Sequence, residues 1–304
     1  MSRIPINPLV DFAFKKVLGD PANTDILIDF LNSILHLRPP ITAVEIQNPF
    51  NPQDFETDKL TVVDVKARDD HGRTYQIEVQ VQVHSALPAR VLYSWARTHI
   101  QQIHIGDHYQ LLRPTLSIWI LDALLFPQSL RVHHRFLLMD PDTGMQLTDH
   151  IELHVLQLKH FRMPAALDEE ARWVYFLKEA RNWTELPASL DCPALRKAMN
   201  KLDAISESTA DRLRYQAREE YLLEQATLEH FRKEALEDLK QTQEALGQTQ
   251  EALGQAQEAL EQTQEALQQA ERARNQAEEA RRQAEDREAR LLALLRAAGV
   301  DPTS

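Results

Sequence analysis

A seven-residue unit repeats almost unchanged in the last third of the chain and constrains its fold more than any other feature. Gln241–Gly247 reads QTQEALG, Gln248–Gly254 repeats it, and two related copies extend to Gln268. Leucine recurs at every seventh position: Leu239, Leu246, Leu253, Leu260 and Leu267. Threonine or alanine follows most of these leucines three residues later. These are the two seam positions of a heptad, so the sequence predicts a long C-terminal α-helical heptad-repeat coiled coil.

The seam of this repeat is uneven. Arg274 and Arg281 stand where leucines stood before, and small or polar side chains fill half of the seam. A solvated single helix is the alternative interpretation, because such a seam buries little apolar area. We favour self-association into a homo-oligomer. Gly247 and Gly254 should soften the helix, since each costs about 1 kcal/mol relative to alanine.

Composition divides the chain into a globular part and a helical part. We predict a domain over 1–215, a helical connector over 216–238, the heptad segment over 239–295 and a flexible tail over 296–304. Residues after 215 hold 11 of the 34 basic and 19 of the 46 acidic side chains, so they carry most of the net charge of −12. The first domain is only mildly acidic, which leaves room for a basic groove.

Several functional classes are disfavoured by what the sequence lacks. The single cysteine, Cys192, cannot form an internal disulfide or a cysteine-based zinc site. No run of about 18 apolar residues occurs and no secretory stretch opens the chain, so we expect a cytoplasmic protein without a membrane span. The motifs G-x-x-x-x-G-K-[ST], G-x-G-x-x-G and G-x-S-x-G are missing, which disfavours NTPases, dinucleotide enzymes and α/β-hydrolases.

Apolar periodicity predicts a mixed α/β pattern before the repeat. Helical spacing predicts helices over Asp11–Leu18, Ile26–Leu35, Ala89–Ile105, Glu169–Ala180, Ala194–Ser206 and Arg212–Arg232, the last leading into the repeat. Alternation and short apolar runs predict strands over Leu60–Ala67, Thr74–Val83, Thr115–Leu121 and Glu152–Leu158. Trp173 and Trp183 are expected in a layer that supports the sheet.

The turn Asp70-His71-Gly72 fixes the register of a hairpin, because glycine suits the left-handed position of a three-residue loop. Centring the loop on His71 gives three opposed pairs on one face: Asp64 with Glu78, Val62 with Gln80, and Lys66 with Gln76. Opposed side chains have Cβ atoms roughly 5 Å apart. Two carboxylates so placed repel unless a proton or cation lies between them, and they suit a magnesium site. An exposed hairpin face bearing ordinary polar side chains is the alternative.

A larger pattern surrounds this hairpin. Eight segments follow one another in a characteristic order and spacing: Asp11–Leu18, Asp29–Leu35, Val44–Asn48, Lys59–Ala67, Tyr75–Gln80, Arg90–Trp95, Gln101–Tyr109 and Ile118–Phe126. The pattern continues through Phe136–Met139, Thr148–Leu158 and Ala194–Tyr215. Over roughly residues 5 to 220 it resembles the recombination-promoting nuclease (Rpn-like) transposase family of the PD-(D/E)XK phosphodiesterase superfamily. The resemblance implies a restriction-endonuclease-like core, a central mixed sheet flanked by helices, and magnesium-dependent cleavage of DNA.

The resemblance also implies roles for residues of the hairpin. The motif's aspartate falls on Asp64 and its glutamate on Glu78, and both are expected to hold Mg²⁺. The superfamily lysine position is Gln80, and an E-x-Q form resembles this family's usual pattern. Glutamine can orient a water or hydrogen-bond a phosphate but carries no positive charge. Our hypothesis is that Lys66, on the same face as Asp64, supplies that charge.

Other side chains are weaker candidates for the site. Asp11 is a candidate additional metal-binding acid, and its alternative role is a favourable charge at a helix N-terminus. Five basic residues are candidates for contacts with DNA phosphates, although such residues usually only solubilise a protein: Arg90, Arg97, Arg113, Lys15 and Lys16.

Histidines give little functional signal. His99, His104 and His108 are spaced by five and four, so they do not all share one helix face, and a core or solvated role is favoured. The pair His133-His134 has no acidic or cysteine partner nearby in sequence.

Two classes of function follow. The first is a DNA endonuclease that promotes recombination, with RNA as a lesser variant of its substrate. The second is a catalytically silent binding or scaffold protein, in which the nuclease-like fold is a docking module and the coiled coil sets its valency. No spaced acidic triad of a transposase is evident, so the hairpin indicates cutting rather than strand transfer.

Overall fold

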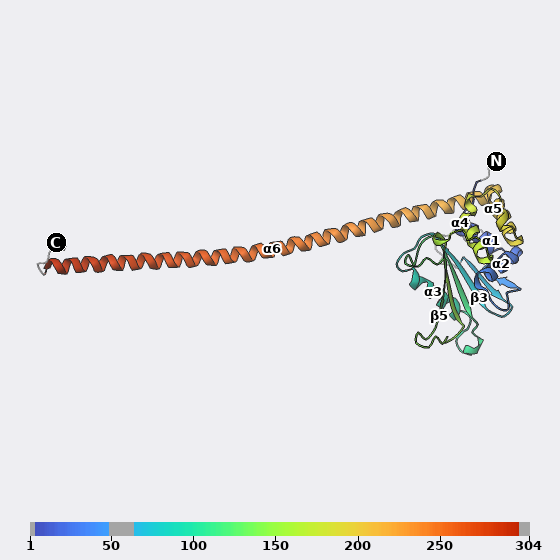
Figure 1. Cartoon of the computed structure of the whole chain (residues 1–304), viewed down its shortest axis with the longest axis horizontal. Helices are drawn as coiled ribbons and strands as arrows, with labels where there is room; N and C mark the ends of the chain where they lie inside the picture. The colour runs from blue at the N-terminus through green and yellow to red at the C-terminus, as the bar shows by residue number, and fades with distance from the viewer. Residues whose placement is uncertain (1–3, 49–63, 298–304) are drawn as a thin grey trace. The chain divides into compact units, whose positions relative to one another are not determined.

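The computed structural model describes residues 4–48 and 64–297 (Figure 1). The helices are α1 (Asp11–Leu18), α2 (Thr24–Leu35), α3 (Leu87–Ile100), α4 (Glu169–Glu179), α5 (Pro193–Glu207) and α6 (Thr209–Ala297). The strands are β1 (Val44–Ile46), β2 (Val65–Asp69), β3 (Thr74–Gln80), β4 (Thr115–Leu121), β5 (His133–Leu137) and β6 (Ile151–Gln157). Short 3-10 turns lie at Pro21–Asn23, Tyr109–Leu111, Leu158–His160, Ala180–Asn182 and Ala188–Leu190.

The strands form one mixed sheet in the order β1-β2-β3-β4-β6-β5. The central pairs β3-β4 and β4-β6 are parallel, whereas β1-β2, β2-β3 and β5-β6 are antiparallel. Parallel strands are covered on both faces, so they consist of continuous apolar runs. The predicted strand Thr115–Leu121 (TLSIWIL) is β4 itself, and all of its residues are buried. The sheet and its flanking helices are consistent with the predicted restriction-endonuclease-like core.

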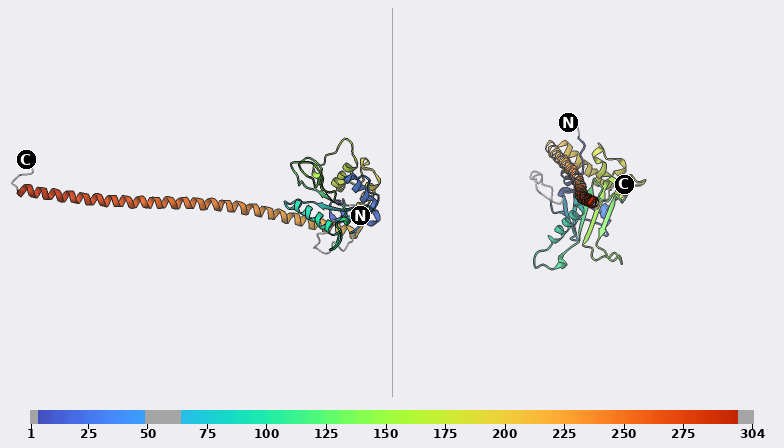
Figure 2. Two further views of the ribbon diagram at one scale, coloured as in Figure 1. Left: turned by 90° about the horizontal axis from the view of Figure 1, so that it is seen from below. Right: turned by 90° about the vertical axis from the view of Figure 1, so that its left-hand side faces the viewer.

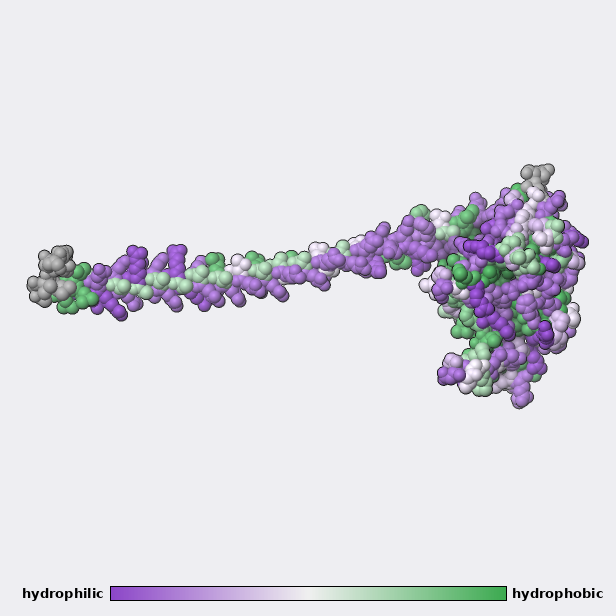
Figure 3. Space-filling model, viewed as in Figure 1, coloured by the Kyte–Doolittle hydropathy of each residue, from purple (hydrophilic) through white to green (hydrophobic). Residues whose placement is uncertain are grey.

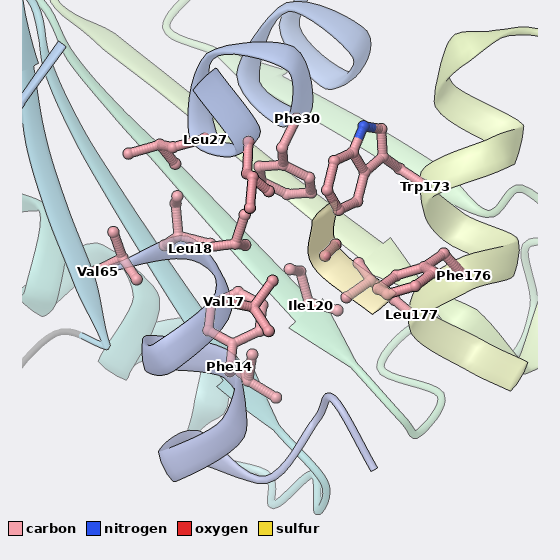
Figure 4. Close-up of a cluster of buried hydrophobic side chains, with 14 of the residues drawn as sticks. Phe14, Val17, Leu18, Leu27, Phe30, Val65, Ile120, Trp173, Phe176 and Leu177 are labelled. Atoms are coloured by element: carbon pink, nitrogen blue, oxygen red, sulfur yellow. The ribbon is translucent and has the colours of Figure 1, made fainter. Parts of the chain in front are cut away.

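One face of the sheet packs against α1, α2, α4 and α5 (Figures 1 and 2). Figure 4 shows Phe30 of α2 meeting Trp173 of α4, whose ring centroids lie 5.3 Å apart in an edge-to-face arrangement. The indole N–H of Trp173 donates to Asp29 Oδ1 at 2.7 Å, so the buried ring keeps a polar partner. Burying each such side chain contributes about 2 kcal/mol, and the helices are thereby fixed on the sheet.

The other face is covered by α3, whose Leu87 and Val91 pack against Trp119 of β4. Side chains alternate along a strand, so Trp119 points away from the face of Ile118. Glu78 of β3 is paired in register with Trp119. The even-numbered side chains of β3 therefore point toward α3.

The observed elements differ from the predicted ones mainly at their ends. The strand predicted over Leu60–Ala67 begins at Val65 within the described residues, and its first four residues lie outside them. The predicted helix Ala89–Ile105 is α3, which ends at Ile100. Strands β1 and β5 were not predicted, because both are short edge strands and β5 has partly exposed side chains throughout.

The chain divides into two compact units, Met1–Thr227 and Leu228–Ser304. Helix α6 starts in the first unit and supplies the second. Figure 3 shows green side chains in a line among purple ones on this helix. The seam leucines Leu246 and Leu260 are 57% and 59% exposed. The helical extension is thus present, whereas the coiled coil stays a prediction. Within the described residues, no helix has both the length and the apolar character needed to cross a membrane.

Candidate functional site

The hairpin of β2 and β3 brings the two predicted acids together. Gly72 adopts the left-handed conformation with φ of 80°, and Lys66 lies opposite Gln76 in the ladder, so the predicted register is confirmed. Asp64 directly precedes β2, and its Oδ2 accepts the Val79 amide N–H at 2.7 Å. This bond fixes Asp64 beside the carboxyl end of β3. The predicted pairing of Val62 with Gln80 lies outside the described residues.

The polar face of the hairpin is covered by α3. Glu78 is 6% exposed and Gln76 is 0% exposed, so the alternative of a solvent-exposed hairpin face is wrong. Sequence alternation could not reveal this, because the cover comes from a helix that follows later in the chain. Ser94 of α3 donates its hydroxyl to Glu78 Oε1 at 3.5 Å. Burying a carboxylate costs free energy, so this pair needs compensation from a proton or a cation.

Burial and mutual repulsion dominate the electrostatics of the pair. Burial raises the pKa of Asp64, and the nearby charge of Asp11 raises it further against opposition from Lys15 and Arg90. Burial also raises the pKa of Glu78, and the charge of Asp64 adds to this effect. Two acids that resist ionising together form a site that gains when positive charge is added.

Arg90 of α3 is the cation that acts on both acids. Its Nη1 donates to Gln80 Oε1 at 3.4 Å, and its guanidinium carbon lies 5.7 Å from the centroid of the Trp119 ring. Arg90 is only partly buried. A fixed positive charge that solvent can reach is suited to a phosphate oxygen.

A chain of hydrogen bonds leads from the sheet to Glu78. Gln76 Nε2 donates to Ser117 Oγ at 2.7 Å and to Ser94 Oγ at 3.3 Å, and Ser94 in turn donates to Glu78. The indole N–H of Trp119 also donates to Ser117, at 2.9 Å. Hydrogen bonds of this kind orient a side chain that binds a metal directly, which here would be Glu78. The i,i+4 spacing of Arg90 and Ser94 is the sequence signal for one helix face, but it does not identify the partner strand.

The N-terminus of α1 borders the site and meets the beginning of α6. Both oxygens of Asp11 accept from Arg218 Nε, at 2.9 and 2.7 Å, and Asp11 Oδ2 also lies 2.7 Å from Arg218 Nη2. Lys16 pairs with Asp211 between the same two helices. Lys15 is buried and its charge acts on Asp64. Arg218 was not predicted, because nothing in the sequence connects a position so late in the chain with α1.

Three other candidates form no hydrogen bond or ion pair with the acid pair within the described part of the chain: Lys66, Arg97 and Arg113. Lys66 is half-buried on the face of the acid pair, and burial alone lowers its pKa. Arg97 is exposed on α3. Arg113 precedes β4 at the hairpin end, where a Cβ on Gly72 would lie 3.2 Å from its Cγ. Since β3 and β4 are parallel, Arg113 is separated from Gln80 by the length of β3, about 20 Å.

The structure brings one other group of metal-type ligands together among the described residues: Asp69, Asp70 and His71, at the hairpin turn. Asp69 already accepts from the His71 and Arg73 amides, from Arg73 Nε and from the Tyr75 hydroxyl. Its oxygens thus stabilise the turn. Asp11, Asp64 and Glu78 do not form such a compact triple.

His133 has an acidic partner that the sequence did not reveal. His133 Nδ1 lies 3.1 Å from Glu170 Oε2, and its Nε2 lies 2.7 Å from His154 Nδ1. His154 Nε2 continues the chain to Glu152 Oε1 at 2.9 Å. Register places these groups on the α4 side of the sheet, opposite the acid pair. His99, predicted for a core or solvated role, contacts Thr115 Oγ1 at 3.0 Å.

A mixed sheet whose hairpin brings the partly buried Asp64 and the buried Glu78 together defines the class: a PD-(D/E)XK-type α/β core. A family model described as PD-(D/E)XK nuclease family transposase matches residues 8–231, and the chain therefore belongs to this family. The resemblance inferred from the sequence is confirmed, and the whole heptad segment, 239–295, lies beyond the match. No curated protein and no solved structure matches the chain.

The acid pair fits the divalent cation that this class of nuclease implies. Its donors are carboxylate oxygens, which hard cations such as Mg²⁺ prefer. The burial and repulsion that raise the pKa values of Asp64 and Glu78 are both relieved by a cation. The donor set therefore suits a hard divalent metal, with Asp64 and Glu78 as the ligands on offer.

Proposed function

We propose that this protein is a magnesium-dependent DNA endonuclease that hydrolyses phosphodiester bonds and promotes recombination. One observation carries the proposal: a chain of the PD-(D/E)XK nuclease family holds the partly buried Asp64 and the buried Glu78 together beside Arg90. Buried acids that oppose each other's ionisation are costly to the fold, and such costs are typical of functional sites.

Each residue of the site has a chemical task in this proposal. Asp64 and Glu78 would hold the cation, which supplies Lewis acidity and a lowered pKa of a bound water. Gln80 has an amide that can orient the attacking water or donate to a phosphate oxygen. Arg90 presents positive charge where the phosphate charge grows, and it keeps Gln80 in place. Lys66 stays a hypothesis for additional positive charge.

DNA is the proposed substrate and Arg90 the proposed first phosphate contact. Arg90 is accessible at the edge of the acid pair, and Arg97 lies two turns further along the same helix. Of the two lysines of α1 predicted to contact DNA, Lys15 is buried and Lys16 is paired with Asp211. Arg113 lies at the far end of β4, so it would contact DNA only outside the immediate cleavage site. Mutating Arg97 should weaken binding evenly across sequences, as expected of a phosphate contact.

We also propose that a homo-oligomer forms through α6. The seam leucines Leu239, Leu246, Leu253, Leu260 and Leu267 are 54 to 61% exposed in the single chain. Exposed leucines at a constant spacing of seven form a continuous stripe, and a second copy of the same helix has the same spacing of about two turns. Two joined copies would offer two acid pairs to the two strands of a duplex.

Supercoiled plasmid tests the proposal directly. Purified protein with Mg²⁺ should nick or linearise the plasmid, and EDTA or Asp64→Ala should abolish cleavage. Asp70→Ala is the matched control, because Asp70 is an exposed acid on the same hairpin and should leave cleavage unchanged. Cleavage that survives in Asp64→Ala would contradict the proposed site.

The alternative is a silent scaffold, favoured by Gln80 at the position of the superfamily lysine. Thermal stability separates the two functions, because a ligand that binds the folded state raises the melting temperature. A working site should be stabilised by Mg²⁺ or Ca²⁺ in wild type but not in Asp64→Ala. A well-folded protein that cleaves no DNA and no RNA, and whose melting temperature does not change with these ions, would establish the scaffold function.

A further inference from the structure

Helix α6, which carries the heptad repeat, also contributes a charged side chain next to the acid pair. Arg218 binds Asp11 through Nε and Nη2 at 2.7 to 2.9 Å. Its guanidinium also lies 4.6 Å from the centroid of the Tyr221 ring, one turn further along the helix. These two partners give this arginine a fixed position.

Neighbouring contacts keep this part of α6 on the first unit. The Tyr215 hydroxyl accepts the Asn7 amide N–H at 3.0 Å and donates to Glu219 Oε1 at 3.0 Å. Tyr215 is 2% exposed, so the helix is packed into the domain at this point. Lys16 and Asp211 form a second ion pair between α1 and α6. The position of Arg218 is therefore set by packing on both sides of it.

The Asp11–Arg218 pair is electrostatically connected to the metal-binding acids. The charge of Asp11 acts on Asp64 in the direction that disfavours its ionisation. The charge of Asp64 acts in turn on Arg218, whose guanidinium it stabilises. Because both oxygens of Asp11 are engaged by Arg218, Asp11 acts on Asp64 through space, as a charge that Arg218 neutralises.

We propose that Arg218 is a positioning residue that holds Asp11 away from the metal and sets how strongly the Asp64–Glu78 pair binds a divalent cation. The inference rests on the proposed nuclease function. It assigns Asp11 a role through charge, in place of the direct metal ligation expected from the sequence.

Charge predicts opposite effects for the two partners. Arg218→Gln leaves Asp11 uncompensated, so the site becomes more negative and Mg²⁺ should bind about fivefold to tenfold more tightly. Asp11→Asn leaves Arg218 uncompensated, so Mg²⁺ should bind about fivefold to tenfold more weakly. The double variant should return to within about twofold of wild type, since the charges removed are equal and opposite.

Isothermal titration of the full-length protein with Mg²⁺, without DNA, measures these shifts. Asp211→Asn is the matched control, because it breaks the other ion pair between α1 and α6 and should lower stability without changing Mg²⁺ affinity. Opposite shifts in the two single variants would support the inference, because a purely structural pair would weaken binding in both.

Three outcomes would overturn it. Shifts of the same sign, or no shift in either variant, would show that the pair only anchors the helix. A loss of affinity beyond about a hundredfold in Asp11→Asn would show that Asp11 is itself a ligand. Wild type that binds no Mg²⁺ and cleaves no DNA would refute the proposed function, whereas active wild type with unshifted variants would refute only this inference.

Discussion

The two regions of this molecule each contain side chains in the environment that their chemistry disfavours. In the first unit, Glu78 is 6% exposed although it is an acid. In the second, Leu253 is 59% exposed although it is apolar. Burying an acid and exposing a row of leucines both cost free energy. A small cation would relieve the cost in the domain, whereas an apolar surface would relieve the cost on the helix.

This comparison also separates two kinds of binding energy. Compensation of a buried carboxylate is local and depends on one or two charges at short distance. Compensation of a leucine stripe is distributed, because each seam position adds a small amount of buried area. Single substitutions should therefore have large effects in the domain and small ones in the helix.

The largest effect is expected when an acid of the pair is replaced by its neutral isostere. Asp64→Asn or Glu78→Gln should lower cleavage by about 1000-fold or more, the size typical of catalytic groups. Either change should also stabilise the metal-free protein by about 2 kcal/mol at pH 8, because a buried repulsion disappears. Urea unfolding with EDTA measures this gain. An Asp64→Asn protein that is less stable and still cleaves DNA would contradict both expectations. The exposed Asp70→Asn variant serves as the control.

The next effect concerns the leucine stripe. Leu246→Glu combined with Leu253→Glu should dissociate the proposed homo-oligomer, because charges at two adjacent seam positions disfavour pairing. Light scattering should then give the mass of one chain, 35.0 kDa. Gln248→Glu with Gln255→Glu adds the same charges two residues after the seam positions and should leave the mass unchanged. A wild-type protein that is already monomeric would instead support the alternative interpretation, a solvated single helix.

A moderate effect is expected from pH, through the buried chain from Glu170 to Glu152. Burial lowers the pKa of His154. Burial raises the pKa of Glu152, but hydrogen bonds from His154 and Arg135 outweigh it and bring the value to about 2. Both folded-state values lie below the unfolded ones. The stability contributed by these two groups is therefore complete above pH 6.5, falls first as His154 of the unfolded chain takes up a proton, and falls again below pH 4.5 because of Glu152.

Guanidinium unfolding between pH 8 and pH 3 measures this loss. Glu152 accounts for about 2 kcal/mol of it. Glu152→Gln should flatten the decline below pH 4.5, whereas Glu45→Gln, an exposed acid on β1, should not. Equal slopes in wild type and Glu152→Gln would show that His154 and Arg135 do not act on Glu152 as their hydrogen bonds indicate.

The smallest effect is expected at the glycines of the repeat. A Cβ added at Gly247 or Gly254 would meet no atom within 4 Å, so alanine fits both positions. Each change should stabilise the helix by about 1 kcal/mol. Circular dichroism on heating detects this as a higher midpoint. Glu261→Gly, at the same heptad position, should lower the midpoint, and no difference between the variants would show that the helix ends unfold independently of this segment.

Local patterns in the sequence were sufficient to predict much of the fold. The helix Asp11–Leu18 and the strand Thr115–Leu121 match the structure at both ends, because apolar spacing and helix or strand length agree there. Register could be predicted because Gly72 specifies one loop geometry. Edge strands β1 and β5 escaped prediction, since a partly exposed edge strand has no clear apolar face.

The site was predictable only where its residues share a hairpin. Asp64 and Glu78 are related by one turn, so alternation alone places them on one face. Ser94 and Arg218 join the site from helices whose packing is decided by the whole core, and no local pattern records such packing. The contact between His133 and Glu170 was also not predictable, because Glu170 lies on α4, 37 positions later in the chain.

The heptad repeat in the last third of the chain has a consequence for how this chain can change in length. Gln241–Gly247 and Gln248–Gly254 are identical, so the gain or loss of one whole copy leaves the sequence of the repeat unchanged. Each event would lengthen or shorten the helix by about 10 Å and return the seam to the same frame. Asp64, Glu78 and Arg218 all precede the repeat. The reach of the helix can thus drift in fixed steps while the chemistry stays under separate selection.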